Sequence, residues 1–520
     1  MIAAPIGVPA AEFQPSDFAY SALLPIFIVF GAALVGVLID AFAPRASRYV
    51  AQVTLTCVAL VAAFVAVVTI SRDNLSKTAS GAIVIDGPSL FLQGAVLALG
   101  FTAVLAMAER LDRDQPDTFT QAGAATPGSP QETAAVRLGA TSTEVFPLTL
   151  FSIAGMMMFV AAGDLLVMFV ALEVLSLPLY ILAGLARRRR LLSQEASLKY
   201  FLLGAFSSAF FLFGAALIYG YSGSVHLNEI AASLNQVVGQ DPLLITGLVL
   251  VLVGLLFKIG AVPFHSWTPD VYQGSPTPVT GFMAACTKLA AFGALLRVLY
   301  VGFDGLAWNW KPIIAVVAVL TMVVGAVLSV TQTDVKRLLA YSSITHAGFI
   351  LVGLIALDRA GLSGVMFYLV AYGFSTIAAF ALIALVRSQG SEATHLSQWA
   401  GLGRRSPLVA ALFSFLLLAF AGIPLTAGFT AKFAVFGAAI GGGATWLAVV
   451  GVVASAVTAF VYVKVIVLMY FSEPTGDTAA VVPSALGAVS VAIGVLATVV
   501  LGVAPSPLLD LAHSSSLFIR

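Results

Sequence analysis

Charged side chains are scarce in this chain of 520 residues. Only 9% of the residues are Asp, Glu, Lys or Arg, and 60% are hydrophobic. Soluble globular proteins carry about 25% charged residues, so that class is excluded. The net charge of +1 gives no reason to expect a nucleic acid or an acidic partner. We therefore expect a membrane protein.

Cysteine is nearly absent, and the two cysteines present, Cys57 and Cys286, each lie inside an apolar run. A disulfide framework, a metal site or an iron–sulfur cluster is therefore not expected. The glycine patterns of nucleotide-binding loops do not occur in a strand–turn–helix setting either. Any energy that drives this chain must reach it from outside.

Long apolar runs dominate instead, and most of them extend over about 20 residues or more, which is the length of a transmembrane helix and not of a barrel strand. The predicted fold class is an all-α polytopic membrane protein with about fourteen transmembrane helices. The expected spans are 20–40, 50–70, 88–108, 146–162, 164–186, 195–220, 243–275, 277–301, 312–332, 334–357, 361–388, 407–440, 445–471 and 481–503.

Basic residues between the spans indicate the orientation, because cytoplasmic loops retain Lys and Arg. Fourteen Lys and Arg residues lie in one set of alternate loops and five lie in the other. The richer set includes Arg187–Arg190, for which topology is a simpler explanation than a binding site for anionic lipids. Residues Met1–Tyr20 lack the basic start of a cleavable signal peptide, so we expect the first span to be retained. Both termini are expected on the outer side.

Residues 109–145 form the one conspicuous linker, which is rich in polar residues, proline and glycine. Such a composition buries too little apolar surface to fold, and we expect a flexible cytoplasmic loop. The other expected units are 1–108 with three spans, 146–301 with five, 312–471 with five, and 481–520 with the last span and the tail.

Two spans contain a break with a lysine beside it. In the seventh span Lys258 lies shortly before Pro263, and in the twelfth Lys432 follows Pro424. Proline lacks the helical N–H and clashes with the preceding turn, so the first helix should break at Pro263, and Gly422 together with Pro424 should break the second. Broken helices at corresponding positions of two halves are typical of transporters built from inverted repeats. We therefore expect two inverted five-helix repeats, the fourth to eighth spans and the ninth to thirteenth.

Ionisable side chains occur inside several spans, where a charge costs about 2.5–3.5 kcal/mol at the bilayer centre. They are expected to face one another, protein dipoles or water, and a lysine beside a broken helix indicates an ion-translocation site. The predicted proton-translocating residues are Glu173, Lys199, Lys258, Lys288, His346 and Lys432, with His265 and Asp270 as secondary candidates.

Glu173 is expected to pair with a lysine of its own half. A nearby carboxylate favours the ammonium form of a lysine, whereas burial favours the neutral amine, so moving the partner would release a proton. A static buried ion pair is the alternative at Glu173. Interior hydrogen bonding without transport is the alternative at His346, and snorkelling to the interface is the alternative at Lys199. Arg297 and Lys464 lie nearer helix ends and are expected to snorkel.

Three segments resemble a known family: LFKIGAVPFHSWTPDVYQGSPTPVTGFMAACTK at 256–288, DVKRLLAYSSITHAGFI at 334–350 and AGIPLTAGFTAKF at 421–433. They are similar to the antiporter-like membrane subunits of respiratory complex I, the proton-pumping NADH:quinone oxidoreductase. The resemblance covers most of the fourth to thirteenth spans. Lys432, and the lack of a long lateral helix after the last span, favour the subunit N type within this family. The linker at 109–145 is a departure from the family pattern.

The resemblance implies a proton-translocating membrane-arm subunit in a bacterial inner membrane, a non-redox part of an enzyme. Glu173 would pair with Lys258, Lys288 and His346 would lie on a central axis, and Lys432 would complete the path. No cofactor would be bound by this chain, since FMN, iron–sulfur clusters, NADH and quinone would reside on partner subunits. The expected partners are other membrane-arm subunits, including a homologous antiporter-like subunit, and membrane lipids.

Two alternatives remain open. The chain could be a subunit of a cation/proton antiporter or of a membrane-bound hydrogenase, since both resemble this family. It could also be a structural membrane scaffold with static ion pairs.

Overall fold

The computed structural model describes residues 18–109, 118–120, 123, 125–126, 129–137, 142–234, 239, 241–388, 391–473, 480–481 and 485–520. Helices make up most of this part of the chain, as predicted. They are α1 (Tyr20–Phe42), α2 (Arg45–Thr69), α3 (Gly87–Met107), α4 (Pro130–Arg137), α5 (Val145–Ala161), α6 (Leu165–Ala183), α7 (Arg190–Ser222), α8 (Leu227–Ser233), α9 (Asp241–Ile259), α10 (Trp267–Gly274), α11 (Thr277–Phe282), α12 (Lys288–Arg297), α13 (Ala307–Val330), α14 (Val335–Leu354), α15 (Arg359–Leu385), α16 (Leu402–Arg405), α17 (Pro407–Ala421), α18 (Ala427–Gly441), α19 (Thr445–Phe471), α20 (Ala485–Val503) and α21 (Ser506–Ser514).

Short elements connect these helices. The strands pair as β1 (Ser76–Thr78) with β2 (Ile83–Ile85), and as a sheet of order β4-β3-β5, with β3 at Val386–Ser388, β4 at Ser391–Glu392 and β5 at Ala480–Val481. Two π-helical segments, η2 (Met283–Thr287) and η3 (Val298–Gly302), continue α11 and α12. Short 3₁₀ segments lie at η1 (Ser71–Asp73), η4 (Asp304–Leu306) and η5 (Leu396–Trp399).

Twelve helices of the described residues are long and apolar enough to cross a membrane, so the chain is a multi-pass membrane protein, as predicted. The helices α5, α17 and α18 are apolar but shorter. Each predicted span overlaps a helix or a broken pair of helices. The total of fourteen crossings and the inverted repeats stay predictions.

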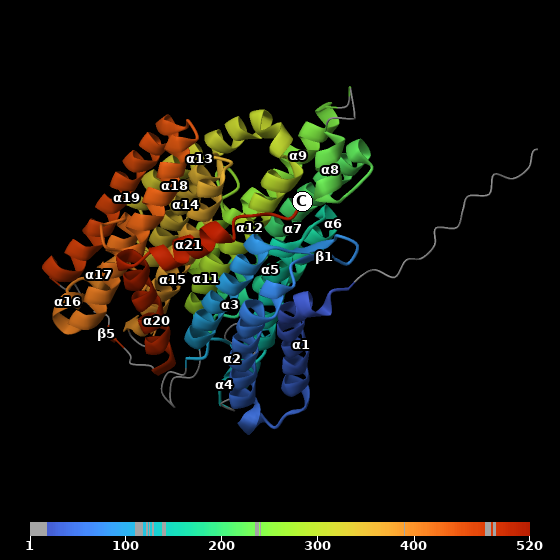
Figure 1. The fold of residues 1–520 in the computed structure, drawn as a ribbon. Helices are drawn as coiled ribbons and strands as arrows, with labels where there is room; N and C mark the ends of the chain where they lie inside the picture. The colour runs from blue at the N-terminus through green and yellow to red at the C-terminus, as the bar shows by residue number, and fades with distance from the viewer. Residues whose placement is uncertain are drawn as a thin grey trace, which may run out of the picture.

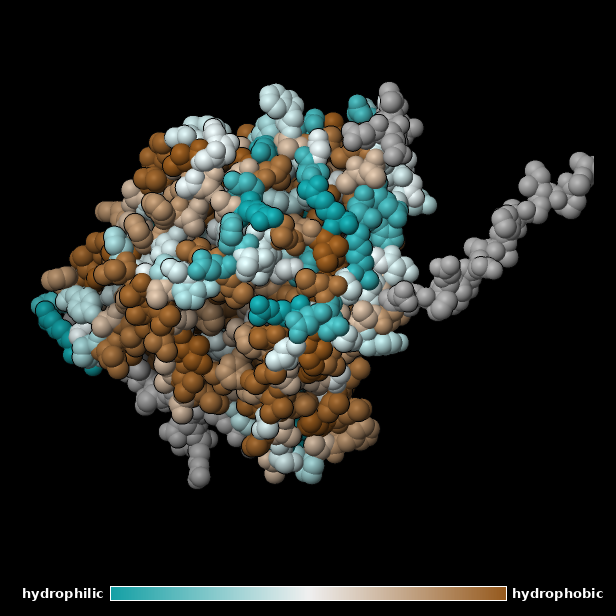
Figure 2. Space-filling model, viewed as in Figure 1, coloured by the Kyte–Doolittle hydropathy of each residue, from teal (hydrophilic) through white to brown (hydrophobic). Residues whose placement is uncertain are grey.

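Helices from the two halves of the chain lie side by side, with those after about residue 300 at one side of Figure 1 in yellow to red. The helices α14 and α15 and the stretch 277–302 are almost wholly buried. Large apolar side chains are exposed instead on the outer helices, for example Leu38 on α1, Val65 on α2 and Val453 on α19. Figure 2 shows hydrophobic residues over α1, α2 and α20, with hydrophilic residues gathered near the C-terminus. A lipid-facing surface around a packed centre explains this distribution.

The two broken helices end in the same way. Gly260 and Gly422 take left-handed φ angles of 78° and 84°, directly after α9 and α17. The N–H after each glycine donates to the carbonyl five residues earlier, at 3.0 and 3.1 Å, which is the Schellman ending of a helix. The first break thus begins at Gly260 and not at Pro263, because a residue before proline is already disfavoured in the helical conformation. The second begins at Gly422, one of the two residues that were expected to break this helix.

The predicted flexible loop includes residues bonded to the helical body. Phe119 and Thr120 are buried, and the Thr120 N–H donates to the carbonyl of Leu185 at 2.8 Å. Arg190 donates to the Thr120 hydroxyl at 2.7 Å and to the carbonyls of Gly123 and Ala125. The Arg190 side chain therefore binds one oxygen each of Thr120, Gly123 and Ala125. At these residues the structure differs from the expected flexible loop. The residues 110–117, 121–122, 124, 127–128 and 138–141 of the predicted loop lie outside the described residues.

Candidate functional site

Four lysine side chains in the described part of the chain are buried at helix ends or inside helices. The exposed fractions of the whole residues are 3% for Lys258 and Lys288, 2% for Lys336 and 6% for Lys432. Three of the four were singled out from the sequence, whereas Lys336 was not. A buried ammonium group needs a compensating partner, so the surroundings of each lysine indicate what it can do.

Lys258 lies near the end of α9 between two tyrosine rings. The side-chain nitrogen is 5.1 Å from the ring centre of Tyr180 and 5.0 Å from that of Tyr200. Trp267, at the start of α10, stacks on Tyr200 with ring centres 4.7 Å apart. Within the described part of the chain, no hydrogen-bond partner contacts the Lys258 nitrogen. Aromatic faces therefore supply the attraction for the cation here.

Glu173 is half-buried in α6, and no described residue forms a hydrogen bond with its Oε1 atom. Its charge acts on Lys258, the expected partner. The Lys258 nitrogen has no hydrogen-bond partner, however, so the two side chains are not in hydrogen-bond contact. Glu173 and Lys258 thus lie close enough for their charges to interact, but they do not form a hydrogen bond with each other.

Lys288 and His346 lie where the two halves meet. The Lys288 nitrogen donates to both the carbonyl and the hydroxyl oxygen of Ser343 in α14 and lies 5.4 Å from the ring centre of Tyr372. His346 stacks on the same Tyr372 ring at 4.8 Å, and its Nδ1 atom is 2.7 Å from the hydroxyl of Tyr368. The Nε2 atom of His346 is buried without a hydrogen-bond partner. The charges of Lys288 and Lys432 both act on this imidazole, which lies on α14 between them in the network.

Lys432 of α18 reaches back to the break before it. Its nitrogen donates to the carbonyls of Phe420 and Ala421 at 2.9 and 2.8 Å and to the hydroxyl of Ser455 at 2.7 Å. The last carbonyls of a helix lack intrahelical partners and carry partial negative charge. The Schellman ending at Gly422 therefore positions the oxygens that hold this lysine.

Lys199 and Asp270 belong to a more exposed ion cluster. Lys199 pairs with Glu195 and Asp270 at 2.7 Å each, and Asp270 also accepts from Arg337 at 2.7 Å. The side chains of Lys199 and Asp270 are 42% and 32% exposed. This cluster joins α7, α10 and α14 at the ends of the helices. His265, in the break after α9, is half-buried, and its Nδ1 atom has no hydrogen-bond partner.

Arg297 does not snorkel, contrary to the expectation. Its side chain is 1% exposed and forms two hydrogen bonds with the buried Asp86 carboxylate, at 2.7 and 3.0 Å. The backbone N–H of Ile519 donates to the same carboxylate at 3.2 Å, and the Phe518 ring covers the guanidinium at 5.1 Å. Asp86 precedes α3, far along the chain, so no local pattern showed the pair. Lys464, in contrast, is exposed on α19, in agreement with the expectation.

Lys336 was missed because it was counted with the basic residues of a loop. It is the second residue of α14, and its nitrogen donates to the carbonyl of Ser275 at 2.7 Å. Its place in the segment DVKRLLAYSSITHAGFI, between an N-capping Asp334 and a polar helix, was a usable signal.

The transmembrane family described as NADH:quinone oxidoreductase/Mrp antiporter matches residues 162–458, which hold every candidate named above except Asp86. A curated relative from Streptomyces griseus, NADH-quinone oxidoreductase subunit N 3, is 56% identical and covers 98% of this chain and 96% of its own length. A chain of respiratory complex I from Thermus thermophilus is 34% identical, with a TM-score of 0.74, and covers 94% of this chain and 99% of that one. A chain of the Mrp complex from Dietzia is similar in fold, with a TM-score of 0.79 at 24% identity over 96% and 97% of the two chains. The chain thus belongs to the NADH:quinone oxidoreductase/Mrp antiporter transmembrane family and, within it, is similar to NADH-quinone oxidoreductase subunit N.

Proposed function

We propose that this chain is a proton-translocating membrane-arm subunit of a bacterial NADH:quinone oxidoreductase. The observation that carries the proposal is the series of buried basic side chains Lys258, Lys288, His346 and Lys432, which extends from one broken helix to the other. Buried ionisable groups in membrane proteins are costly, and they commonly serve ion or proton relays. The names of the relatives support the same function.

In this proposal Glu173 and Lys258 form the switch of the first half. Proximity of the carboxylate favours the ammonium form, and withdrawal leaves a buried amine that gives up its proton. Among the described residues, no hydrogen bond holds Lys258 Nζ or Glu173 Oε1 in place. This supports a pair of side chains that can move in preference to a static ion pair.

Lys288, His346 and Lys432 would carry the proton onward. Lys288 is bonded to Ser343, and His346 offers a hydrogen-bonded Nδ1 atom and a second nitrogen without a protein partner. Imidazole can accept a proton on one nitrogen and release one from the other. Lys432 would hold the proton while it donates to the carbonyls of Phe420 and Ala421 at the end of α17. It would then release the proton to the opposite side of the membrane.

The chain would act as a non-redox subunit of the enzyme. FMN, iron–sulfur clusters, NADH and quinone would be bound by partner subunits, and redox energy would reach this chain as a change in its charge network. Its partners would be other membrane-arm subunits, including a homologous antiporter-like subunit, with lipids around α1, α2 and α19. We infer the bacterial inner membrane, with both termini outside and two inverted repeats, at 146–301 and 312–471, from the basic residues and the paired breaks.

The experiment that tests this function is native gel electrophoresis of mildly solubilised membranes that carry the tagged chain, with in-gel staining for NADH oxidation. We expect the tag to migrate with a very large NADH-oxidising band. Migration in a smaller assembly without that activity would contradict the proposal and favour an antiporter or hydrogenase subunit, to be followed by sodium and hydrogen assays.

A further inference from the structure

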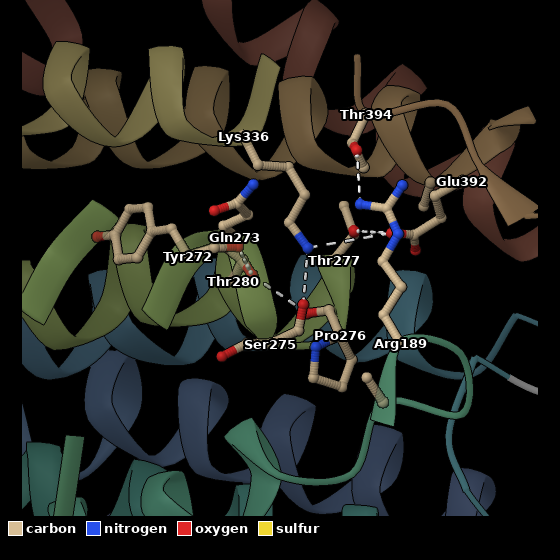
Figure 3. A network of polar contacts seen from close by, with 12 residues as sticks. Arg189, Tyr272, Gln273, Ser275, Pro276, Thr277, Thr280, Lys336, Glu392 and Thr394 are labelled. Carbon is tan, nitrogen blue, oxygen red and sulfur yellow. Dashed lines mark hydrogen bonds and ion pairs between the residues drawn. The ribbon is translucent and has the colours of Figure 1, made fainter. Parts of the chain in front are cut away.

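Lys336 lies in a second polar network, separate from the four proton sites proposed above. Figure 3 shows its side chain reaching from α14 to the turn between α10 and α11, where the Ser275 carbonyl accepts its hydrogen bond at 2.7 Å. This turn separates the second half of the first broken helix from the helix that leads to Lys288. Lys336 of the second half of the chain is thus anchored to the first half.

A carboxylate lies between Lys336 and the protein surface. The Oε2 atom of Glu392 is 4.0 Å from the Lys336 nitrogen, and the Thr277 hydroxyl donates to the same oxygen at 2.5 Å. The Glu392 side chain is 20% exposed, whereas that of Lys336 is 3% exposed. Asp334 and Arg189 are the other charged groups that act on Lys336, and the Arg189 guanidinium donates to Thr394 at 2.7 Å. Glu392 therefore connects a buried amine to solvent.

Polar groups also lie on α11, the helix that leads from the Ser275 turn toward Lys288. The Thr280 hydroxyl lies 3.2 Å from the carbonyls of Pro276 and Tyr272, one turn into α11. Farther along, the Ser343 hydroxyl of α14 binds Lys288. Hydroxyl groups can both donate and accept, so they can take part in proton transfer between ionisable groups. The Thr280 hydroxyl on α11 and the Ser343 hydroxyl beside Lys288 thus lie at the two ends of the stretch that leads from the turn anchoring Lys336 to the central lysine.

We propose that Glu392 and Lys336 form a proton-loading pair that supplies Lys288 from the side of the membrane rich in Arg and Lys, which is predicted to be cytoplasmic. This inference rests on the proposed function, since it adds an uptake route to the same proton path. In each cycle Glu392 takes one proton from solvent and passes it to the neutral amine of Lys336. Lys336 then releases one proton toward Lys288, and both residues return to their starting forms.

A purely structural role predicts a different outcome. Lys336 joins the two halves of the chain, so a structural contact would affect assembly and would respond equally at every pH. A loading pair affects the supply of protons instead. The effect of losing the pair is therefore smaller when the proton concentration on the predicted cytoplasmic side is higher.

The test uses inverted membrane vesicles, in which the cytoplasmic side faces the assay buffer, and follows proton uptake per NADH oxidised. The variants are Glu392→Gln and Lys336→Gln, with Lys464→Gln as the matched control, because Lys464 is an exposed lysine of the second half. We expect a several-fold loss of proton uptake per NADH in both variants at alkaline buffer pH. In Glu392→Gln the uptake should return toward the control as the buffer is made more acidic.

The inference would be overturned if both variants pumped like Lys464→Gln, or if their loss were the same at every pH. If Lys336→Gln did not assemble, Glu392→Gln alone would decide, since a partly exposed carboxylate leaves no large buried gap. Failure of the underlying function is recognised separately, because an assembled Lys258→Ala complex would then pump normally.

Discussion

The side-chain nitrogen of Lys288 donates to the carbonyl and the hydroxyl oxygen of Ser343, and this contact joins α12 to α14 inside the protein. Lys288 belongs to the first predicted repeat and Ser343 to the second. His346 lies one helical turn beyond Ser343 on the same helix. This contact is thus the point at which a proton path through the first half can continue into the second.

Replacing Lys288 with glutamine should interrupt that path. Glutamine can still donate a hydrogen bond to Ser343, but it cannot carry a proton, and a positioned acid–base group is worth on the order of a hundredfold in proton transfer rate. We predict an assembled complex in which proton uptake per NADH falls roughly tenfold or more. Vesicle pumping, compared with Lys464→Gln, checks this, and uptake equal to the control would exclude Lys288 from the path.

Gly422→Ala should disturb Lys432 through the backbone. A Cβ atom at this position would lie 3.0 Å from Lys432 Cδ and 3.3 Å from its nitrogen. The left-handed conformation of Gly422 would also cost a residue with a side chain about 1–2 kcal/mol. We predict a lower melting temperature and weaker pumping.

The control for this change is Gly437→Ala on α18, where, apart from the neighbouring backbone of the same helix, no atom of a described residue lies within 4 Å of the added carbon. Alanine in that helical position is expected to be neutral or slightly stabilising. Equal effects of Gly422→Ala and Gly437→Ala on thermal unfolding and pumping would show that the Schellman ending does not position Lys432.

Arg297→Ala should impair assembly, since it leaves the Asp86 carboxylate buried without its partner. Removing one member of a buried ion pair costs about 3–5 kcal/mol. We predict a large loss of the assembled complex on native gels. The double variant Asp86→Asn with Arg297→Met keeps the cap of α3 and removes both charges, so it should recover part of the loss.

The comparison for that pair is Arg520→Ala. Arg520 pairs with Asp304 at 2.6 Å, but its side chain is 65% exposed, so the change should have little effect on assembly. Normal assembly of Arg297→Ala would mean that the charge of Asp86 is compensated in another way.

Lys199→Gln is predicted to leave pumping nearly unchanged. Its ion pairs with Glu195 and Asp270 are solvent-screened at 42% exposure, and such pairs contribute about 1 kcal/mol or less. Asp270→Asn should reduce thermal stability more, because Asp270 also binds Arg337. If pumping by Lys199→Gln fell as far as in Lys258→Ala, Lys199 would belong to the proton path after all.

The membrane-spanning helices were predictable because apolar runs of sufficient length must satisfy their backbone groups internally. Lys258, Lys288 and Lys432 could be singled out for a similar reason, since a lysine inside an apolar run requires an explanation. The first break was placed a few residues late, at Pro263, whereas Gly422 was indicated for the second. Glycine endings decide where α9 and α17 stop, whereas the proline rule indicates only that a helix cannot continue.

Contacts between distant segments were not predictable. Arg297 and Asp86 are 211 residues apart, and Lys336 depends on Ser275 and Glu392 from two other segments. The tyrosines around Lys258 come from α6 and α7 and carry no local signal of their role. The three-dimensional structure was therefore needed to show that Arg297 forms a buried ion pair and does not snorkel. It was likewise needed to show that Lys336 is buried and does not lie in an exposed loop.

The most direct test of the proposed proton path is proton uptake per NADH by vesicles that carry Lys258→Ala, with Lys464→Ala as the matched control. Among the described residues none hydrogen-bonds with the Lys258 nitrogen, so its removal breaks no hydrogen bond and the complex should assemble. The account predicts control levels of assembled complex on native gels and a roughly tenfold or greater loss of proton uptake. Control levels of both assembly and proton uptake would contradict it.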